Sequence, residues 1–150
     1  MHLKVRMGGF TLVEVLVAVL VLGVGLLGIV TLQSRSLQYN QQAYLYSQAV
    51  FLANDVAERM RANTEQLGSY EIDYGTTVTG VSLTQCMSTN CSELQIARWD
   101  LAVWKNALAA ALPGGDGSIT RLGSQFVITT QFENARDGEG PQEIAVTVQL

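Results

Sequence analysis

A long apolar run near the N-terminus constrains this chain more than any other feature. Within residues 10–32 the only polar side chains are those of Thr11, Glu14 and Thr31, and only Glu14 carries a charge. As an α-helix this segment rises roughly 34 Å, which exceeds the hydrocarbon core of a bilayer at about 30 Å. We therefore predict a membrane-spanning helix with one carboxylate near its start, a group that is usually functional.

The residues before this run carry positive charge only. Residues 1–9 contain Lys4 and Arg6 and no acidic residue, which predicts a cytoplasmic N-terminus. The polar head is short and no Ala-x-Ala-like cleavage site follows, so an ordinary secretory signal peptide is disfavoured. An uncleaved signal anchor remains as the stronger ordinary alternative.

The junction between the basic leader and the apolar run has a specific pattern. Residues 9–14 read Gly-Phe-Thr-Leu-Val-Glu, and this set resembles the prepilin signature of type IV pilins and type II secretion pseudopilins. The resemblance implies cleavage between Gly9 and Phe10 by a membrane aspartyl prepilin peptidase, N-methylation of Phe10, and extraction into a helical filament. It also implies that Glu14 pairs with the new α-amino group of Phe10 in a neighbouring subunit.

Three glycines interrupt the apolar run. Gly23, Gly25 and Gly28 match G-x-G-x-x-G, but they lie inside a membrane-length segment and not between a strand and a helix, so we exclude a dinucleotide site. Each glycine weakens a helix by about 0.8–1 kcal/mol in water, and small residues let helices approach closely. Many major pilins carry a proline here, which this chain lacks. The helix flexibility that the family suggests would therefore depend on these glycines.

The helix is predicted to continue well beyond the membrane segment, because residues 33–62 contain neither Gly nor Pro. An apolar stripe at spacings of three and four predicts packing against a globular domain; its members are Leu45, Ala49, Leu52, Val56 and Met60, with Tyr44 and Phe51 widening it. Two charge pairs at helical spacing, Asp55–Arg59 and Glu58–Arg61, are predicted to support the outer face.

The sequence predicts four segments. They are a prepilin leader at 1–9, a transmembrane and assembly helix at 10–32, the second half of the long helix at 33–63, and a globular periplasmic head at 64–150. The head carries two cysteines, Cys86 and Cys91. The anchor orientation places them in an oxidising compartment, so we predict a structural disulfide rather than a reactive pair.

No catalytic or metal-binding constellation can be assembled from the sequence. The only histidine, His2, lies in the leader, which excludes Ser–His–Asp and Cys–His chemistry and the usual zinc sites. Asp100 has no second catalytic group placed with it. The acidic residues of the glycine-rich loops, Asp116, Asp137 and Glu139, lack calcium-loop spacing and are predicted to be solvated. We expect no metal, no cofactor and no enzymatic activity.

A second helix and a sheet are predicted for the rest of the head. The helix covers about 92–112, with Ser92 as N-cap, Pro113 as its stop, and Trp99 outside its apolar stripe; the stripe consists of Leu94, Ala97, Leu101, Trp104, Leu108 and Leu112. Beyond Gly117 apolar residues alternate in three segments, which predicts three antiparallel strands with one buried face. The fold class is therefore α+β, and the resemblance implies a type IV pilin fold in which a helix over about 10–63 packs its second half on this sheet.

Two further segments narrow the resemblance. Residues 41–63 and 98–117 are similar to PilV-type minor pilins, also called type IV pilus modification proteins. This implies a minor pilin of the inner membrane, and later of the pilus at the cell surface, that helps to prime pilus assembly with other minor pilins and the major pilin. A minor pseudopilin of type II secretion and a ligand-binding tip adhesin are the alternatives. Without Lys4 and Arg6 the chain has 7 basic and 13 acidic residues, so no nucleic acid is expected as a partner.

Overall fold

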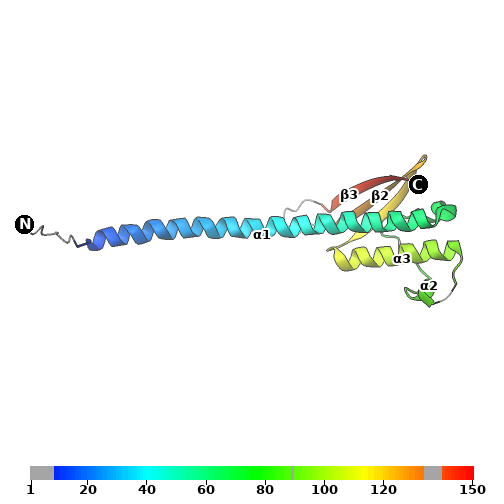
Figure 1. Cartoon of the computed structure of the whole chain (residues 1–150), viewed down its shortest axis with the longest axis horizontal. Helices are drawn as coiled ribbons and strands as arrows, with labels where there is room; N and C mark the ends of the chain where they lie inside the picture. The colour runs from blue at the N-terminus through cyan, green and yellow to red at the C-terminus, as the bar shows by residue number, and fades with distance from the viewer. Residues whose placement is uncertain (1–8, 89, 134–139) are drawn as a thin grey trace, which may run out of the picture. The chain divides into compact units, whose positions relative to one another are not determined.

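The computed structural model describes residues 9–88, 90–133 and 140–150. Its two long helices and its single antiparallel sheet confirm the α+β class predicted from the sequence (Figure 1). In chain order the elements are α1 (Leu12–Ala62), the 3₁₀ helix η1 (Thr64–Tyr70), α2 (Gln85–Ser88), α3 (Glu93–Ala111), β1 (Asp116–Leu122), β2 (Gln125–Phe132) and β3 (Gln142–Gln149).

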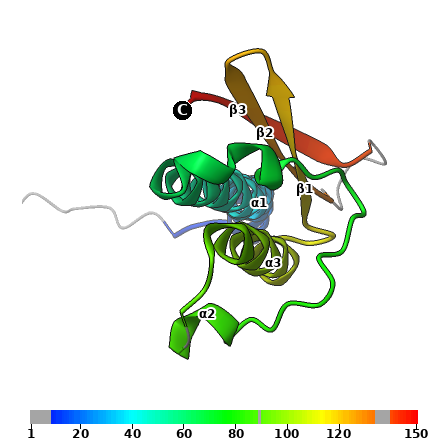
Figure 2. The same cartoon turned by 90° about the vertical axis from the view of Figure 1, so that its right-hand side faces the viewer.

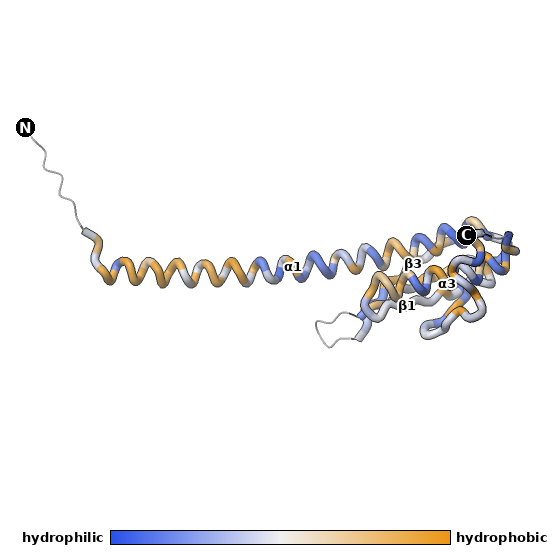
Figure 3. Tube along the Cα trace, turned by 90° about the horizontal axis from the view of Figure 1, so that it is seen from below, coloured by the Kyte–Doolittle hydropathy of each residue, from blue (hydrophilic) through white to orange (hydrophobic). Residues whose placement is uncertain are grey.

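The chain forms two compact units, Met1–Gln41 and Gln42–Leu150. Helix α1 is continuous through the division between them. In the first unit every Leu, Ile and Val from Leu12 to Leu32 is exposed by 52% or more. Within the described residues α1 is the one helix that is long and apolar enough to cross a membrane, and Figure 3 shows its N-terminal part as an almost continuous apolar stretch.

The second unit, which we call the head, is built around the C-terminal part of α1. Helix α3 and the sheet pack on different sides of it (Figure 2). The predicted stripe is confirmed, since α1 buries one face at spacings of three and four; its fully or almost fully buried members are Ala49, Leu52, Ala53, Val56, Ala57 and Met60. The core is completed by apolar residues of α3 and of the sheet.

Two aromatic residues that we expected to widen this stripe do not belong to it. Tyr44 is 60% exposed and Phe51 is 66% exposed. They are seven residues apart and so lie on one side of α1. At 100° per residue, that side is roughly opposite the one that Ala49 and Val56 bury. Their prediction as core residues was therefore wrong.

Helix α3 begins and ends as the sequence predicts. The Ser92 hydroxyl accepts a hydrogen bond from the backbone N–H of Gln95, and the Gln95 side chain accepts one from the backbone N–H of Ser92, which together form a capping box. The α3 stripe is buried from Ala97 onward, but Leu94 in its first turn is 42% exposed. The buried stripe therefore begins one turn later than predicted.

The sheet has the order β1-β2-β3, and both pairs of strands are antiparallel. Gly123, with a φ of +65°, forms the tight turn between β1 and β2. β2 is the central strand, and its inward residues Phe126, Ile128, Thr130 and Phe132 are buried. Most of the predicted loop between β2 and β3, including Asp137 and Glu139, lies outside the described residues.

Candidate assembly segment and the polar contacts of the head

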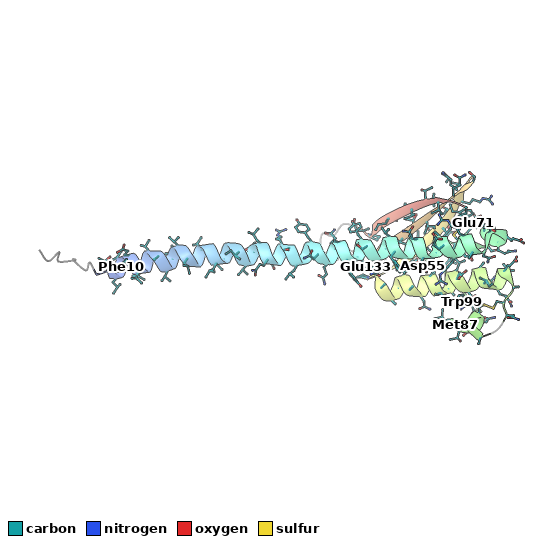
Figure 4. All side chains as sticks on the ribbon, in the orientation of Figure 1. Phe10, Asp55, Glu71, Met87, Trp99 and Glu133 are labelled. Atoms are coloured by element: carbon teal, nitrogen blue, oxygen red, sulfur yellow. A yellow bond between two sulfur atoms is a disulfide. The ribbon has the colours of Figure 1, made fainter. Side chains whose placement is uncertain are left out.

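The peptide bond between Gly9 and Phe10 lies in non-helical chain just before α1. Both residues are exposed, and the Phe10 side chain is 83% exposed (Figure 4). A protease needs its substrate in an extended, accessible form, because helical backbone groups are occupied by their own hydrogen bonds. The described geometry therefore leaves the expected cleavage bond accessible.

Glu14 lies in the first turn of α1. Its backbone N–H donates to the Thr11 carbonyl oxygen at 3.1 Å and approaches the Thr11 hydroxyl at 3.4 Å, so Thr11 acts as the helix cap. A carboxylate in the first turn is also favoured by the helix macrodipole. Our sequence analysis missed this cap, although Thr11-x-x-Glu14 has the spacing of a capping box.

The three glycines of the apolar run lie in regular α-helix. A Cβ atom added at Gly23, Gly25 or Gly28 would meet no described atom within 4 Å. Alanine would therefore fit at each position in this chain and would favour the helix. Packing within the described chain gives no reason for glycine here.

Asp100 lies at the centre of a buried polar cluster, which also contains Arg59, Tyr70, Asp55 and Asn63. The Arg59 guanidinium donates to Asp100 at 3.0 Å and to Asp55 at 2.9 Å. The Tyr70 hydroxyl donates to the other Asp100 oxygen at 2.6 Å. The Asp100 side chain is only 5% exposed. The cluster thus joins α1, η1 and α3 through one carboxylate.

Two pKa shifts follow from this burial. Burial opposes the charge of Arg59, but the hydrogen bonds with Asp55 and Asp100 outweigh it and raise the Arg59 pKa above its ordinary value. Burial, and to a smaller extent the hydrogen bond to Asp100, raises the pKa of Tyr70 well above its usual range. Arg59 is therefore held charged and Tyr70 neutral, as their hydrogen bonds require.

Asn63 completes the cluster at the end of α1. Its side-chain amide donates to the Glu93 carbonyl oxygen at 2.8 Å and to the Tyr70 hydroxyl at 3.3 Å. Among the described residues no buried side-chain nitrogen or oxygen lacks a hydrogen-bond partner. Asp100 accordingly serves packing between the helices, and the sequence offered no sign of this because Arg59 lies 41 positions away from it.

A second polar contact attaches the segment after η1 to α3 and β1. The Asp116 carboxylate accepts from Lys105 at 2.5 Å and from the Gly75 backbone N–H at 2.6 Å, while Lys105 also donates to the Asp73 carbonyl oxygen. Burial opposes ionisation, yet the bonds from Gly75 and Lys105 lower the Asp116 pKa. Our expectation of a solvated loop charge at Asp116 was therefore wrong.

The cysteines and Trp99 hold the region around α2. Cys86 and Cys91 form the predicted disulfide. The Trp99 indole N–H donates to the Leu83 carbonyl oxygen at 2.8 Å, and the Arg59 guanidinium lies 5.8 Å from the Trp99 ring centre. Figure 4 shows Trp99 on α3 and Met87 on α2 beside it. Trp99, which lies outside the apolar stripe of α3, thus packs laterally against the segment around α2.

Comparison with known proteins supports the interpretation of residues 5–102. A family model described as a prokaryotic N-terminal methylation motif matches residues 5–30, and one described as Type IV pilin Tt1218 matches residues 31–102. The two matches are contiguous and together include Glu14, Arg59, the disulfide and Asp100. No curated protein and no solved structure matches the chain.

Proposed function

The chain belongs to the type IV pilins, and from this premise we propose that it is a minor pilin of the complex that primes or caps a pilus. The prepilin peptidase would cleave it between Gly9 and Phe10, and Phe10 would then be N-methylated. The remaining chain would span the inner membrane once, with the head in the periplasm, before it joins the major pilin and other minor pilins in a filament at the cell surface.

The observation that carries this proposal is the exposed apolar part of α1 with its single charge. A surface of this size is not stable in water, because burial of apolar area contributes about 25 cal/mol per Å². Lipid covers such a helix first, and in a filament the helices of other subunits replace the lipid. The same segment therefore supports both the anchored and the assembled state.

Glu14 supports assembly over simple anchoring. A carboxylate costs about 2.5–3.5 kcal/mol at the middle of a bilayer and less near its surface, so an anchor without a further role would not keep it. Cleavage before Phe10 creates an α-amino group, and we propose that this amine in a neighbouring subunit pairs with Glu14. A buried pair adds little net stability, but it selects one axial position because an unpaired charge costs about 3–5 kcal/mol.

The head supports a structural role rather than a chemical one. Its buried polar groups, Asp100 and Tyr70 among them, are engaged in contacts between helices. The matched family is one of pilins, which are structural subunits. The similarity of residues 41–63 and 98–117 to PilV-type proteins favours the minor pilin over the minor pseudopilin, which is the second candidate.

The experiment is a deletion of the gene for this protein, with complementation by the full chain. In the deletion strain we expect fewer surface pili and loss of other minor pilins from sheared filaments. In the complemented strain we expect far fewer copies of this subunit than of the major pilin. Unchanged piliation combined with lost protein secretion would identify a pseudopilin instead. Normal piliation and secretion with lost adhesion would identify a tip adhesin.

A further inference from the structure

Strand β3 is an edge of the sheet with one open side. Within the described residues it pairs along its whole length with β2, and no strand pairs with its other side. The opposite edge is partly closed, since Ile72 and Ile119 exchange backbone hydrogen bonds of 3.0 and 2.8 Å beside β1. An open edge presents backbone N–H and C=O groups that can pair with another chain.

The inward face of β3 is less well covered than that of β2. Phe126 and Ile128 on β2 are 2% and 0% exposed, whereas Ile144 and Val146 on β3 are only half-buried. The core therefore becomes thinner toward the open edge. A further strand beside β3 would cover this remaining apolar surface.

The side of α1 next to β3 continues the same surface. The Tyr46 hydroxyl donates to the Gln142 side-chain oxygen at 3.0 Å, and its ring packs edge-to-face on Phe132 with 5.4 Å between centres. Val50 and Asn54 follow Tyr46 at four-residue steps on one side of α1. An open hollow of about 500 Å³ lies here; its lining residues are Tyr46, Ser47, Val50, Phe51 and Asn54.

The side-chain donors of Ser47 and Asn54 in this hollow are already satisfied by carbonyl groups of their own helix. The Ser47 hydroxyl donates to the Ala43 carbonyl oxygen at 2.8 Å, and the Asn54 amide donates to the Val50 carbonyl oxygen at 2.9 Å. Apolar side chains can therefore enter the hollow without leaving these donors unpaired, which would be costly. The hollow is suited to apolar side chains.

We propose that β3 accepts a fourth strand from a different polypeptide. The segment would be extended and apolar at every second position, so that its inward side chains cover Ile144 and Val146 and reach the hollow beside Val50. A helix in this place would leave the edge of β3 unpaired. The inference goes beyond the minor-pilin role and stands whether or not that role is right.

Charge favours a different polypeptide over a second copy. From residue 42 onward the chain has 6 Lys and Arg against 12 Asp and Glu, so two heads repel each other. Glu143, the one charged residue of β3, instead favours a Lys or Arg in the partner strand.

The first test uses the full chain in detergent micelles and a defined probe. The probe is a nine-residue peptide that alternates valine and threonine and ends in lysine on both sides; its control has proline at the central valine. We expect the probe, but not the control, to slow amide hydrogen exchange in β3. Equal binding of both peptides, or slowed exchange outside β3 only, would overturn the proposal.

Matched variants locate the binding edge. Val146→Lys places a charge at the open edge and should weaken probe binding at least tenfold, whereas Thr120→Lys on exposed β1 should change it less than twofold. Glu143→Lys leaves the core untouched and should weaken binding of the lysine probe several-fold, while it strengthens binding of a glutamate-ended probe. Tryptophan fluorescence, to which the buried Trp104 contributes, verifies folding of each variant. Equal effects of Val146→Lys and Thr120→Lys in folded protein would refute the proposal.

A cellular test identifies the occupant. A photo-crosslinking amino acid replaces Thr147 on β3, or Thr120 on β1 as control. Cross-links from position 147 to an extended, basic segment of another protein would support the proposal. Cross-links to a helix, cross-links to a second copy of this chain, or no more product than from position 120 would each contradict it.

Discussion

Arg59 and Asp100 form an ion pair of 3.0 Å between α1 and α3, and the Asp100 side chain is only 5% exposed. Removing two charges from water is costly, and the cost is offset only when further hydrogen bonds satisfy both groups. Here Tyr70 donates to Asp100, and Asp55 accepts from Arg59. The pair therefore makes the packing of the two helices depend on one specific arrangement of polar groups.

Asp100→Ala should destabilise the head strongly, because it leaves the partly buried Arg59 charge with Asp55 alone and Tyr70 without its acceptor. We expect the free energy of unfolding to fall by about 3–5 kcal/mol. Urea denaturation of the full chain in mild detergent, followed by far-UV circular dichroism, measures it. Glu58→Ala is the control, since its exposed pair with Arg61 contributes about 0–1 kcal/mol. A loss as small as that of the control would show that the cluster is unimportant.

The lowered pKa of Asp116 predicts that the stability of the protein falls with pH in the acid range. A carboxylate whose pKa is lowered by folding contributes stability above its unfolded pKa of about 4, and this is lost as pH falls through the folded value. Asp116→Asn should therefore cost about 1–2 kcal/mol at pH 7. Denaturation at several pH values should show the difference from the unmodified protein shrinking as pH falls below the unfolded pKa of about 4. A difference that stays constant down to pH 2 would argue against ionic stabilisation.

The Cys86–Cys91 disulfide closes a short loop, so its effect should be modest. Replacing both cysteines by serine should lower the free energy of unfolding by about 2 kcal/mol through loop entropy. Reduction of the unmodified protein should give the same loss, whereas the double variant should not respond to reductant. Alkylation followed by mass spectrometry of exported protein should find no free thiol. Two alkylated cysteines would refute a structural disulfide in the exported form.

We expect the glycines at 23, 25 and 28 to affect assembly with other subunits and not the stability of the isolated chain. Changing all three to alanine favours the helix by about 0.8–1 kcal/mol each in water, and no described atom obstructs the added methyl groups. We expect normal membrane insertion but reduced incorporation into filaments, because close helix contacts and local unwinding both become harder. Immunoblots of membranes and sheared filaments measure the two steps. Val24→Ala is the control, and equal behaviour of both variants would exclude a special role for glycine.

Glu14→Ala should also separate anchoring from assembly. Loss of the charge makes α1 more apolar, so insertion should be unchanged or better. Incorporation should fail, because the amine of the neighbouring Phe10 would then be buried without a partner at a cost of about 3–5 kcal/mol. Comparison of membrane and filament fractions tests this. Thr31→Ala provides a control within the same helix. Normal amounts of Glu14→Ala protein in filaments would contradict the proposed pairing.

Helix boundaries were predictable because they depend on neighbours in the sequence. The expected ranges of about 10–63 and 92–112 compare with α1 at Leu12–Ala62 and α3 at Glu93–Ala111. Thr11 and Ser92 cap these helices through residues three positions away. A stripe at spacings of three and four likewise requires nothing beyond the chain itself.

Which apolar residues are covered was less predictable. Phe51 and Leu94 are as apolar as their buried neighbours, and Tyr44 has a large aromatic ring, yet all three are exposed. The width of a buried stripe depends on the elements that pack beside the helix, and periodicity alone does not reveal where those elements end. Strand β3 is a further case. Apolar residues alternate in its sequence as they do in β2, yet its inward face is less well covered.

By itself the sequence determined the membrane-length helix, its single carboxylate, the cleavage pattern and the main helices and strands, because each is a local property of composition or spacing. Only the tertiary structure decided that Asp100 binds Arg59 and Tyr70, that Asp116 binds Lys105 and Gly75, and that β3 has an open edge. The bonds of Asp100 and the Asp116–Gly75 bond join residues 30 to 41 positions apart. Spacing carries no information on such contacts, since they form only when folding brings separate elements together.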